Sequence, residues 1–226
     1  MGSDADAVQN LALTKVAEGT NFFAALEHPL MPTTVADKML RFAGAPRQVF
    51  LSRVGLPGEY SRALAQFDAQ VDRAGSIILG ELPSSDPRRR GQAAAPIRHA
   101  GLAYTRSSTI AKFAFLGAAA NASYSLLATH PRGLPPRFAN ALATALNDVH
   151  DCLLPDDIAD LLPPSTCSSL DFMQFFGTPN TRTRAFQLQR RITRKYTKRV
   201  ADAEMLFSLS SPHAFEQRMP SGRHNG

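Results

Sequence analysis

Apolar side chains recur at three-to-four spacing in every periodic stretch of this 226-residue chain. Residues at this spacing share one face of an α-helix, whereas a β-strand places every second residue on one face. The clearest early example follows Pro57, where Tyr60, Leu64, Phe67 and Val71 form one series. The pattern predicts an all-α protein.

Proline and glycine limit the length of the predicted helices. The chain has 16 prolines, 14 glycines and no tryptophan. Proline ends a helix because it lacks an amide donor and clashes with the preceding turn. We therefore expect a multi-helix bundle of short-to-medium helices with Pro-rich connections and a long basic C-terminal helix. The expected helices cover residues 3–28, 33–42, 47–54, 57–78, 107–128, 136–149, 156–162, 165–176 and the stretch from 182 onward.

A Ser/Pro/Arg-rich stretch at residues 83–91 divides the chain, because such a composition favours an exposed loop over a regular element. We expect a helical subdomain at 1–82, a loop at 83–106, a second helical subdomain with the basic helix at 107–211, and a disordered tail at 212–226. Ser107 or Ser108 is expected to cap the helix that opens the second subdomain.

Residues 182–199 contain eight of the 25 basic residues and no acidic residue. Without these eight, 17 basic residues face 19 acidic ones, so the net charge of +6 becomes −2. Leu188, Ile192 and Tyr196 lie on one apolar stripe, which places the cations on the opposite and flanking faces. A helix charged only for solubility usually mixes signs, because like-charged neighbours destabilise it. The segment is therefore predicted to bind a polyanion, with release of counterions from its phosphates.

Two further basic clusters extend this prediction. One is the loop sequence Arg88–Arg90 with Arg98 and His99, and the other is Arg41 with Arg47 and Arg53. The candidate nucleic-acid-binding residues are Arg184, Arg190, Arg191, Arg194, Lys195, Lys198, Arg47, Arg53, Arg88, Arg89, Arg90 and Arg98. The alternatives are a solvated face, a localisation patch in the loop, and a docking surface for an acidic protein.

The residue pattern does not favour catalysis, and no metal or other cofactor is expected. Two cysteines and six scattered histidines form no zinc-binding spacing. His150 and Cys152 could be a nucleophilic pair, but on a helix they point about 200° apart. Acidic residues near the N-terminus do not fit a signal peptide, and no apolar run approaches the roughly 18 residues that span a bilayer. An intracellular protein, cytoplasmic or nuclear and without a membrane partner, is expected.

Three stretches resemble the region that follows the palm in non-LTR retrotransposon reverse transcriptases. Gly2-Ser3-Asp4-Ala5-Asp6-Ala7-Val8 is similar to the sequence just after the palm. Met39-Leu40-Arg41-Phe42-Ala43-Gly44-Ala45-Pro46-Arg47-Gln48-Val49-Phe50-Leu51-Ser52-Arg53, with Phe67-Asp68 downstream, resembles the thumb. Ala95-Pro96-Ile97-Arg98-His99-Ala100-Gly101-Leu102-Ala103-Tyr104 resembles the post-thumb motif. In that motif Ala100 and Ala103 replace glycines, and alanine resists a positive φ angle.

The resemblance implies a thumb-like subdomain at 1–82 and a post-thumb motif within 83–106. It also implies that the fingers and palm, which hold the catalytic metals, are absent from this chain. The expected function is non-catalytic binding of RNA or an RNA-DNA duplex through its backbone, with a separate catalytic polymerase chain as a possible partner. The alternatives are a helical scaffold that binds an acidic protein, and a truncated element fragment without a selected function.

Overall fold

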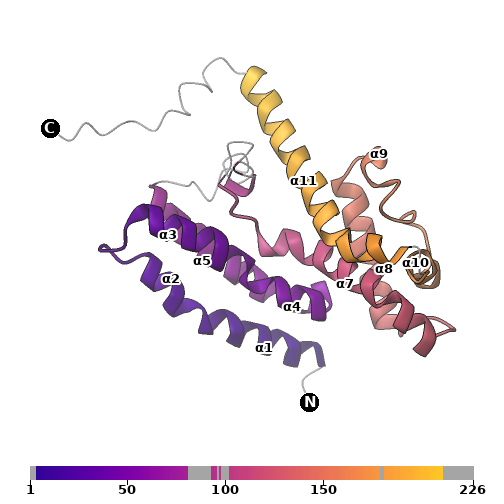
Figure 1. Cartoon of the computed structure of the whole chain (residues 1–226). Helices are drawn as coiled ribbons and strands as arrows, with labels where there is room; N and C mark the ends of the chain where they lie inside the picture. The colour runs from indigo at the N-terminus through magenta and orange to yellow at the C-terminus, as the bar shows by residue number, and fades with distance from the viewer. Residues whose placement is uncertain (1–3, 81–92, 96, 98–101, 179–180, 211–226) are drawn as a thin grey trace.

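The computed structural model describes residues 4–80, 93–95, 97, 102–178 and 181–210 (Figure 1). Within these residues all regular elements are helical, which confirms the all-α fold class. In chain order they are α1 (Asp4–Glu18), α2 (Thr20–Leu26), α3 (Thr33–Met39), the π-helical turn η1 (Leu40–Gly44), the 3-10 turn η2 (Ala45–Gln48), α4 (Val49–Val54), the 3-10 turn η3 (Pro57–Tyr60), α5 (Ser61–Leu79), α7 (Ser107–Thr129), α8 (Pro136–Cys152), α9 (Pro155–Ile158), α10 (Ser169–Phe176) and α11 (Arg182–Ser210).

Several predicted helices are shorter than expected. The first divides at Gly19, since glycine is a poor helix former. The second continues past Met39 as a π turn, and the helix expected from Pro57 begins as a 3-10 turn. The helix expected over residues 156–162 is the single turn α9, after which Leu161 and Leu162 enter the core.

Helix α10 begins at Ser169 and not at Ser165, because Ser168 is its N-cap. The Ser168 hydroxyl accepts a hydrogen bond from the Asp171 amide, and the Asp171 carboxylate accepts one from the Ser168 amide. This reciprocal capping box satisfies two backbone donors at the helix end. A further hydrogen bond, donated by the Ser168 hydroxyl to the Asp171 carboxylate, and then the bond from the Ser168 amide hold the pKa of Asp171 below its ordinary value.

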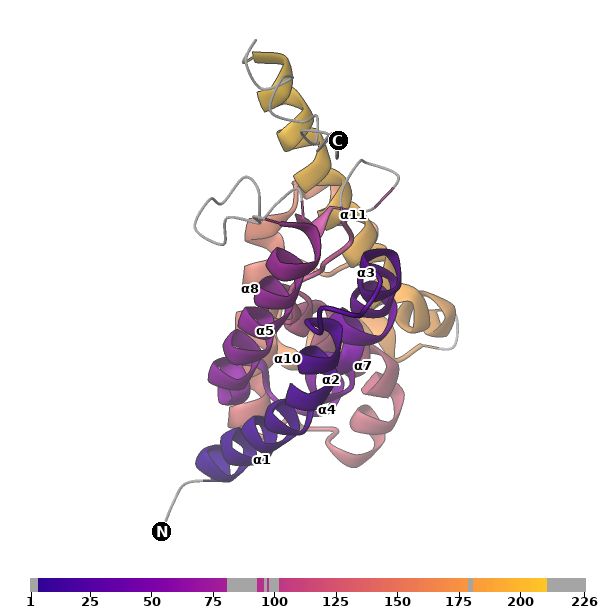
Figure 2. The same ribbon diagram turned by 90° about the vertical axis from the view of Figure 1, so that its left-hand side faces the viewer.

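Helix α7 lies between two groups of helices (Figures 1 and 2). One core cluster joins α7 to α8, α10 and α11 and includes Phe113, Leu116 and Ile192. The other joins α1, α2 and α5 and includes Phe67 and Ala111, the latter from α7. Both clusters therefore depend on α7, and the subdomain division of the chain stays a prediction.

Among the described residues, α7 is the one helix that is long and apolar enough to cross a membrane, by length and composition alone. No such segment was expected from the sequence. In the structure, 56% of the most apolar window of α7 is buried inside the molecule. Its apolar residues serve the two core clusters.

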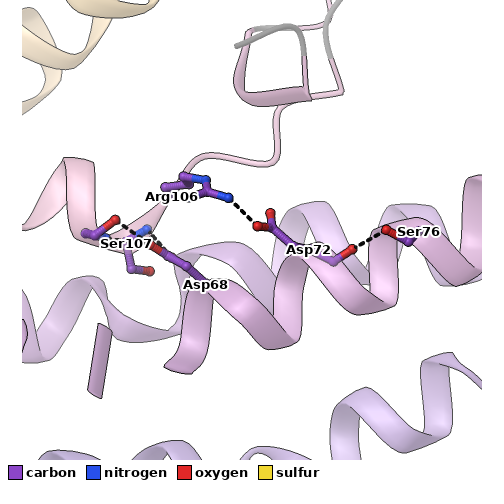
Figure 3. A network of polar contacts seen from close by, with 6 residues as sticks. Asp68, Asp72, Ser76, Arg106 and Ser107 are labelled. Carbon is purple, nitrogen blue, oxygen red and sulfur yellow. Dashed lines mark hydrogen bonds and ion pairs between the residues drawn. The ribbon is translucent and has the colours of Figure 1, made fainter. Parts of the chain in front are cut away.

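The start of α7 is capped from another helix and not by its own serines (Figure 3). Asp68 of α5 is only 4% exposed. Its carboxylate accepts hydrogen bonds from the amides of Ser107 and Ser108 at 2.7 and 3.1 Å, and from the Ser108 hydroxyl at 2.5 Å. One turn later, Asp72 pairs with Arg106. A carboxylate suits the positive end of a helix dipole, so Asp68 positions α7 against α5.

Ala103 has a φ of 57°, in the left-handed region. Ala103 therefore adopts a positive φ although alanine disfavours it. The Ala103 amide donates to the Ala95 carbonyl at 2.8 Å, and the Tyr104 amide donates to the Ala93 carbonyl at the same distance. These bonds hold the turn in a conformation that normally costs a non-glycine residue about 1 to 2 kcal/mol.

We predict that Asp68→Ala lowers the free energy of unfolding by about 3 kcal/mol, because buried amide donors at the start of α7 lose their acceptor. Urea denaturation followed by circular dichroism measures the loss. Asp72→Ala is the matched control and should cost less than about 1 kcal/mol, since its ion pair with Arg106 is partly exposed. Equal losses in the two variants would contradict the capping role of Asp68.

We also predict that Ala103→Gly raises the free energy of unfolding by about 0.5 to 1 kcal/mol. Relief of the left-handed strain should exceed the extra backbone entropy of glycine. Ala118→Gly, at a helical position of α7, should instead destabilise by about 1 kcal/mol. The same urea titration compares both, and destabilisation by Ala103→Gly would show that the turn carries no strain.

Candidate nucleic-acid interface

The apolar stripe of α11 packs on α7. Ala185, Leu188 and Ile192 are buried, and the Tyr196 ring lies 5.3 Å from the Phe113 ring, centroid to centroid. Burial raises the pKa of the Tyr196 hydroxyl above its ordinary value. The buried residues confirm the predicted docking face as far as Ile192, and Tyr196 is half-buried, but further along the helix Ala201 is buried and Ala203 is exposed.

A close approach of backbones sets the position of α11. A Cβ atom at Gly117 of α7 would lie 2.9 Å from the Gln189 Cβ and 3.2 Å from the Gln189 amide nitrogen. The absence of a side chain at Gly117 lets α11 approach α7 this closely. Gly117 therefore determines where along α7 Gln189 and its neighbours on α11 pack.

One flank of α11 is neutralised by the region around α9. Arg191 pairs with Asp160 at 2.8 Å and Lys195 pairs with Asp157 at 3.3 Å. Arg199 donates to the carbonyl oxygen of Cys152 at 2.8 Å. Acidic residues outside α11 therefore neutralise part of the positive charge of this helix.

The other flank of α11 carries unneutralised cations. Arg190 and Arg194 are exposed, and neither takes part in an ion pair with a described residue. Arg53 of α4 reaches this flank and donates from Nε and a terminal nitrogen to Gln189 Oε1, at 3.1 and 3.0 Å. Phe186 projects beside them with 78% of its surface exposed. We name Arg53, Phe186, Arg190 and Arg194 the basic face.

The basic face surrounds an open hollow of about 700 Å³. Gln187, Gln189, Thr193 and Arg191 also line it, and Arg191 is the one of its arginines that pairs with Asp160. A hollow with four arginines and an exposed aromatic ring combines the two features by which proteins hold a nucleic-acid strand, namely charge for the phosphates and a surface for base stacking. Sequence reasoning found the cations but missed Phe186, which lies off the apolar stripe and belongs to no motif.

The remaining candidate residues are dispersed. Arg184 and Lys198 are exposed on α11 but do not line the hollow. Arg47 lies over the Phe22 ring, with its guanidinium carbon 4.6 Å from the ring centroid. Arg88, Arg89, Arg90 and Arg98 lie outside the described residues, as does the predicted tail.

Arg41, the other member of the Arg47 cluster, is held by an acid. Its guanidinium pairs with Asp37 at 2.6 and 2.9 Å. The Tyr104 hydroxyl also donates to Asp37, at 2.6 Å. Burial, and then the bond to Asp37, raises the pKa of Tyr104 well above its usual range. This cluster ties α3 to the segment that precedes α7.

No arrangement that could hold a metal ion occurs among the described His, Cys, Asp and Glu side chains. His150 Nε2 lies 3.0 Å from the carbonyl oxygen of Pro163, whereas the Cys152 sulfur lies 3.5 Å from Lys112 Nζ. These two side chains thus contact different parts of the molecule, as the helical geometry predicted.

Comparisons of the chain with family models, with curated proteins and with solved structures find no match. The residues and geometry of the basic face are therefore the ground for a functional proposal.

We predict that Gly117→Ala destabilises the protein by about 1 to 3 kcal/mol, because the added methyl group meets Gln189 Cβ and its backbone. The loss should occur although alanine favours an isolated helix by about 1 kcal/mol. Gly58→Ala is the matched control, since a Cβ there meets nothing within 4 Å. Thermal unfolding of both variants tests the contact, and a stabilised Gly117→Ala variant would refute it.

Proposed function

We propose that this chain is a non-catalytic helical module that binds the backbone of RNA or an RNA-DNA duplex through the basic face. The observation that carries the proposal is the convergence of Arg53, Arg190 and Arg194 around one hollow, beside the exposed ring of Phe186. Cations from two helices that lie far apart in the sequence meet there without a carboxylate partner for Arg190 or Arg194 among the described residues.

Phosphate contacts position a protein on a nucleic acid but carry no sequence information. Binding through the basic face should therefore be independent of sequence and sensitive to salt. The long basic helix α11 supplies most of these contacts in the proposal, and Phe186 supplies a stacking surface where a base is unpaired. An intracellular location, cytoplasmic or nuclear, suits such a partner.

The resemblance to non-LTR reverse transcriptases supports the same proposal. In those enzymes the thumb contacts the primer-template duplex, while the metals lie in the palm. The chain would accordingly act beside a separate catalytic polymerase chain and would incorporate no nucleotides alone.

A helical scaffold that binds an acidic protein is the second candidate. Phe50 and Val54 of α4 are 70% and 67% exposed, and they lie one turn apart on the helix that carries Arg53. Exposed apolar side chains next to cations are typical of a protein-docking surface. Titration with an acidic amphipathic peptide therefore accompanies the nucleic-acid measurement below.

The two flanks of α11 provide the decisive experiment. We predict that Arg190→Gln with Arg194→Gln weakens binding to an RNA-DNA duplex about tenfold. The slope of log affinity against log salt should fall by about 1.5, which corresponds to two lost phosphate contacts. Fluorescence anisotropy at several salt concentrations measures both quantities.

Lys195→Gln with Arg199→Gln removes the same charge from the other flank, where neither side chain lines the hollow, and is the matched control. It should change duplex affinity much less, because Lys195 is already paired with Asp157 and Arg199 donates to the Cys152 carbonyl. Equal losses in the two double variants would mean that only net charge matters. Absence of duplex binding by the wild-type protein, together with tight binding of the acidic peptide, would favour the scaffold.

A further inference from the structure

A second, smaller hollow of about 230 Å³ adjoins the basic face. It lies where η2 and α4, the segment before α7, and α11 meet. Gln189 and Thr193 line both hollows, so the two lie next to each other along α11. A group held at the basic face therefore lies beside the smaller hollow.

The wall of the smaller hollow offers polar groups that the fold does not use. Ser107 is 3% exposed, and its hydroxyl is buried without a hydrogen-bond partner among the described residues. A buried hydroxyl of this kind costs free energy unless something pairs with it. Gln189 Oε1 accepts both bonds from Arg53, which leaves the amide nitrogen as a donor. Thr105 and Thr193 add hydroxyls that can donate or accept.

The rest of the wall is apolar, with Val49 and Ile110 among its residues. Its charged member, Arg41, is neutralised by the two contacts with Asp37. A phosphate would therefore find no uncompensated cation here, in contrast to the basic face. A neutral planar group with donors and acceptors along its edge fits apolar walls and unpaired polar groups better.

We propose that the smaller hollow receives one unpaired nucleobase while the basic face holds the backbone beside it. This inference rests on the proposed nucleic-acid binding and specifies which structure of the strand is preferred. A base within a continuous duplex cannot enter, because its edge is paired and its faces are stacked. The chain should therefore prefer a duplex that carries an unpaired nucleotide over one that is fully paired.

Three RNA-DNA duplexes of equal length test the proposal. The first is fully paired, the second carries one unpaired nucleotide, and the third carries an abasic residue at that unpaired position. The wild-type protein should bind the second about tenfold more tightly than the third, since stacking and edge contacts of a single base have this magnitude. Anisotropy titrations at one fixed salt concentration make the comparison.

Thr105→Leu fills the smaller hollow from the segment before α7 and does not line the larger one, and Thr183→Leu makes the same change at an exposed position of α11. Thr105→Leu should abolish the preference for the unpaired nucleotide and keep the affinity for the paired duplex. Thr183→Leu should retain both. Thermal melts identify folded variants, and Ser107→Ala, which removes the buried hydroxyl without adding volume, gives a second measure of the same preference.

Equal affinity of the wild-type protein for the second and third duplexes would overturn the nucleobase site. The proposed function would still stand if the paired duplex binds and the Arg190 and Arg194 variant weakens it. An abasic duplex that binds as tightly as its base-containing counterpart but loses affinity in Thr105→Leu would point to the sugar-phosphate kink and also overturn the proposal. Failure to bind any of the duplexes would reject both ideas.

Discussion

The buried carboxylate of Asp68 at the start of α7 is the interaction on which the rest of the fold depends. Helix α7 contributes to both core clusters, so its position relative to α5 decides how the two groups of helices meet. Because the Ser107 amide at the start of α7 is buried, it needs an acceptor, and none of the local serines supplies it. The Asp68 carboxylate satisfies two amides and a hydroxyl together, which fixes α7 in position as well as direction.

The candidate interface follows from a second contact along the same helix. Gly117 lets α11 approach α7 until the two backbones nearly touch at Gln189. At this position Gln189 of α11 accepts a hydrogen bond from Arg53 of α4. Helices α4, α7 and α11 therefore meet within one turn of α11. The larger and the smaller hollow both border this point, because Gln189 and Thr193 line both of them.

The sequence predicts the helices whose apolar residues follow one stripe, and it predicts where proline separates them. Helix α5 after Pro57 and the buried stripe of α11 are examples, because their periodicity reflects a single docking face. Contacts between distant segments leave no such local pattern. The Asp68 cap, the pairing of Arg191 with Asp160, and the meeting of Arg53 with Phe186 are of this kind.

The residue type at one motif position does not by itself predict the backbone conformation there, as Ala103 shows. A positive φ at a position without glycine is expected to be avoided, yet two backbone hydrogen bonds impose it. Local propensity is a preference of about 1 to 2 kcal/mol, and tertiary hydrogen bonding can exceed it. The candidate residues of the arginine-rich loop remain a prediction from sequence alone.

The arrangement of charge on α11 depends on the rest of the folded chain. As a free peptide, the segment would have eight like charges within 18 residues, without Asp157 and Asp160 to offset them and without α7 to bury its stripe. Repulsion between neighbouring cations and the loss of packing would both oppose helix formation. A peptide of this sequence would bind polyanions as a flexible polycation, and the arrangement of Arg190 and Arg194 against Arg53 would exist only in the folded chain.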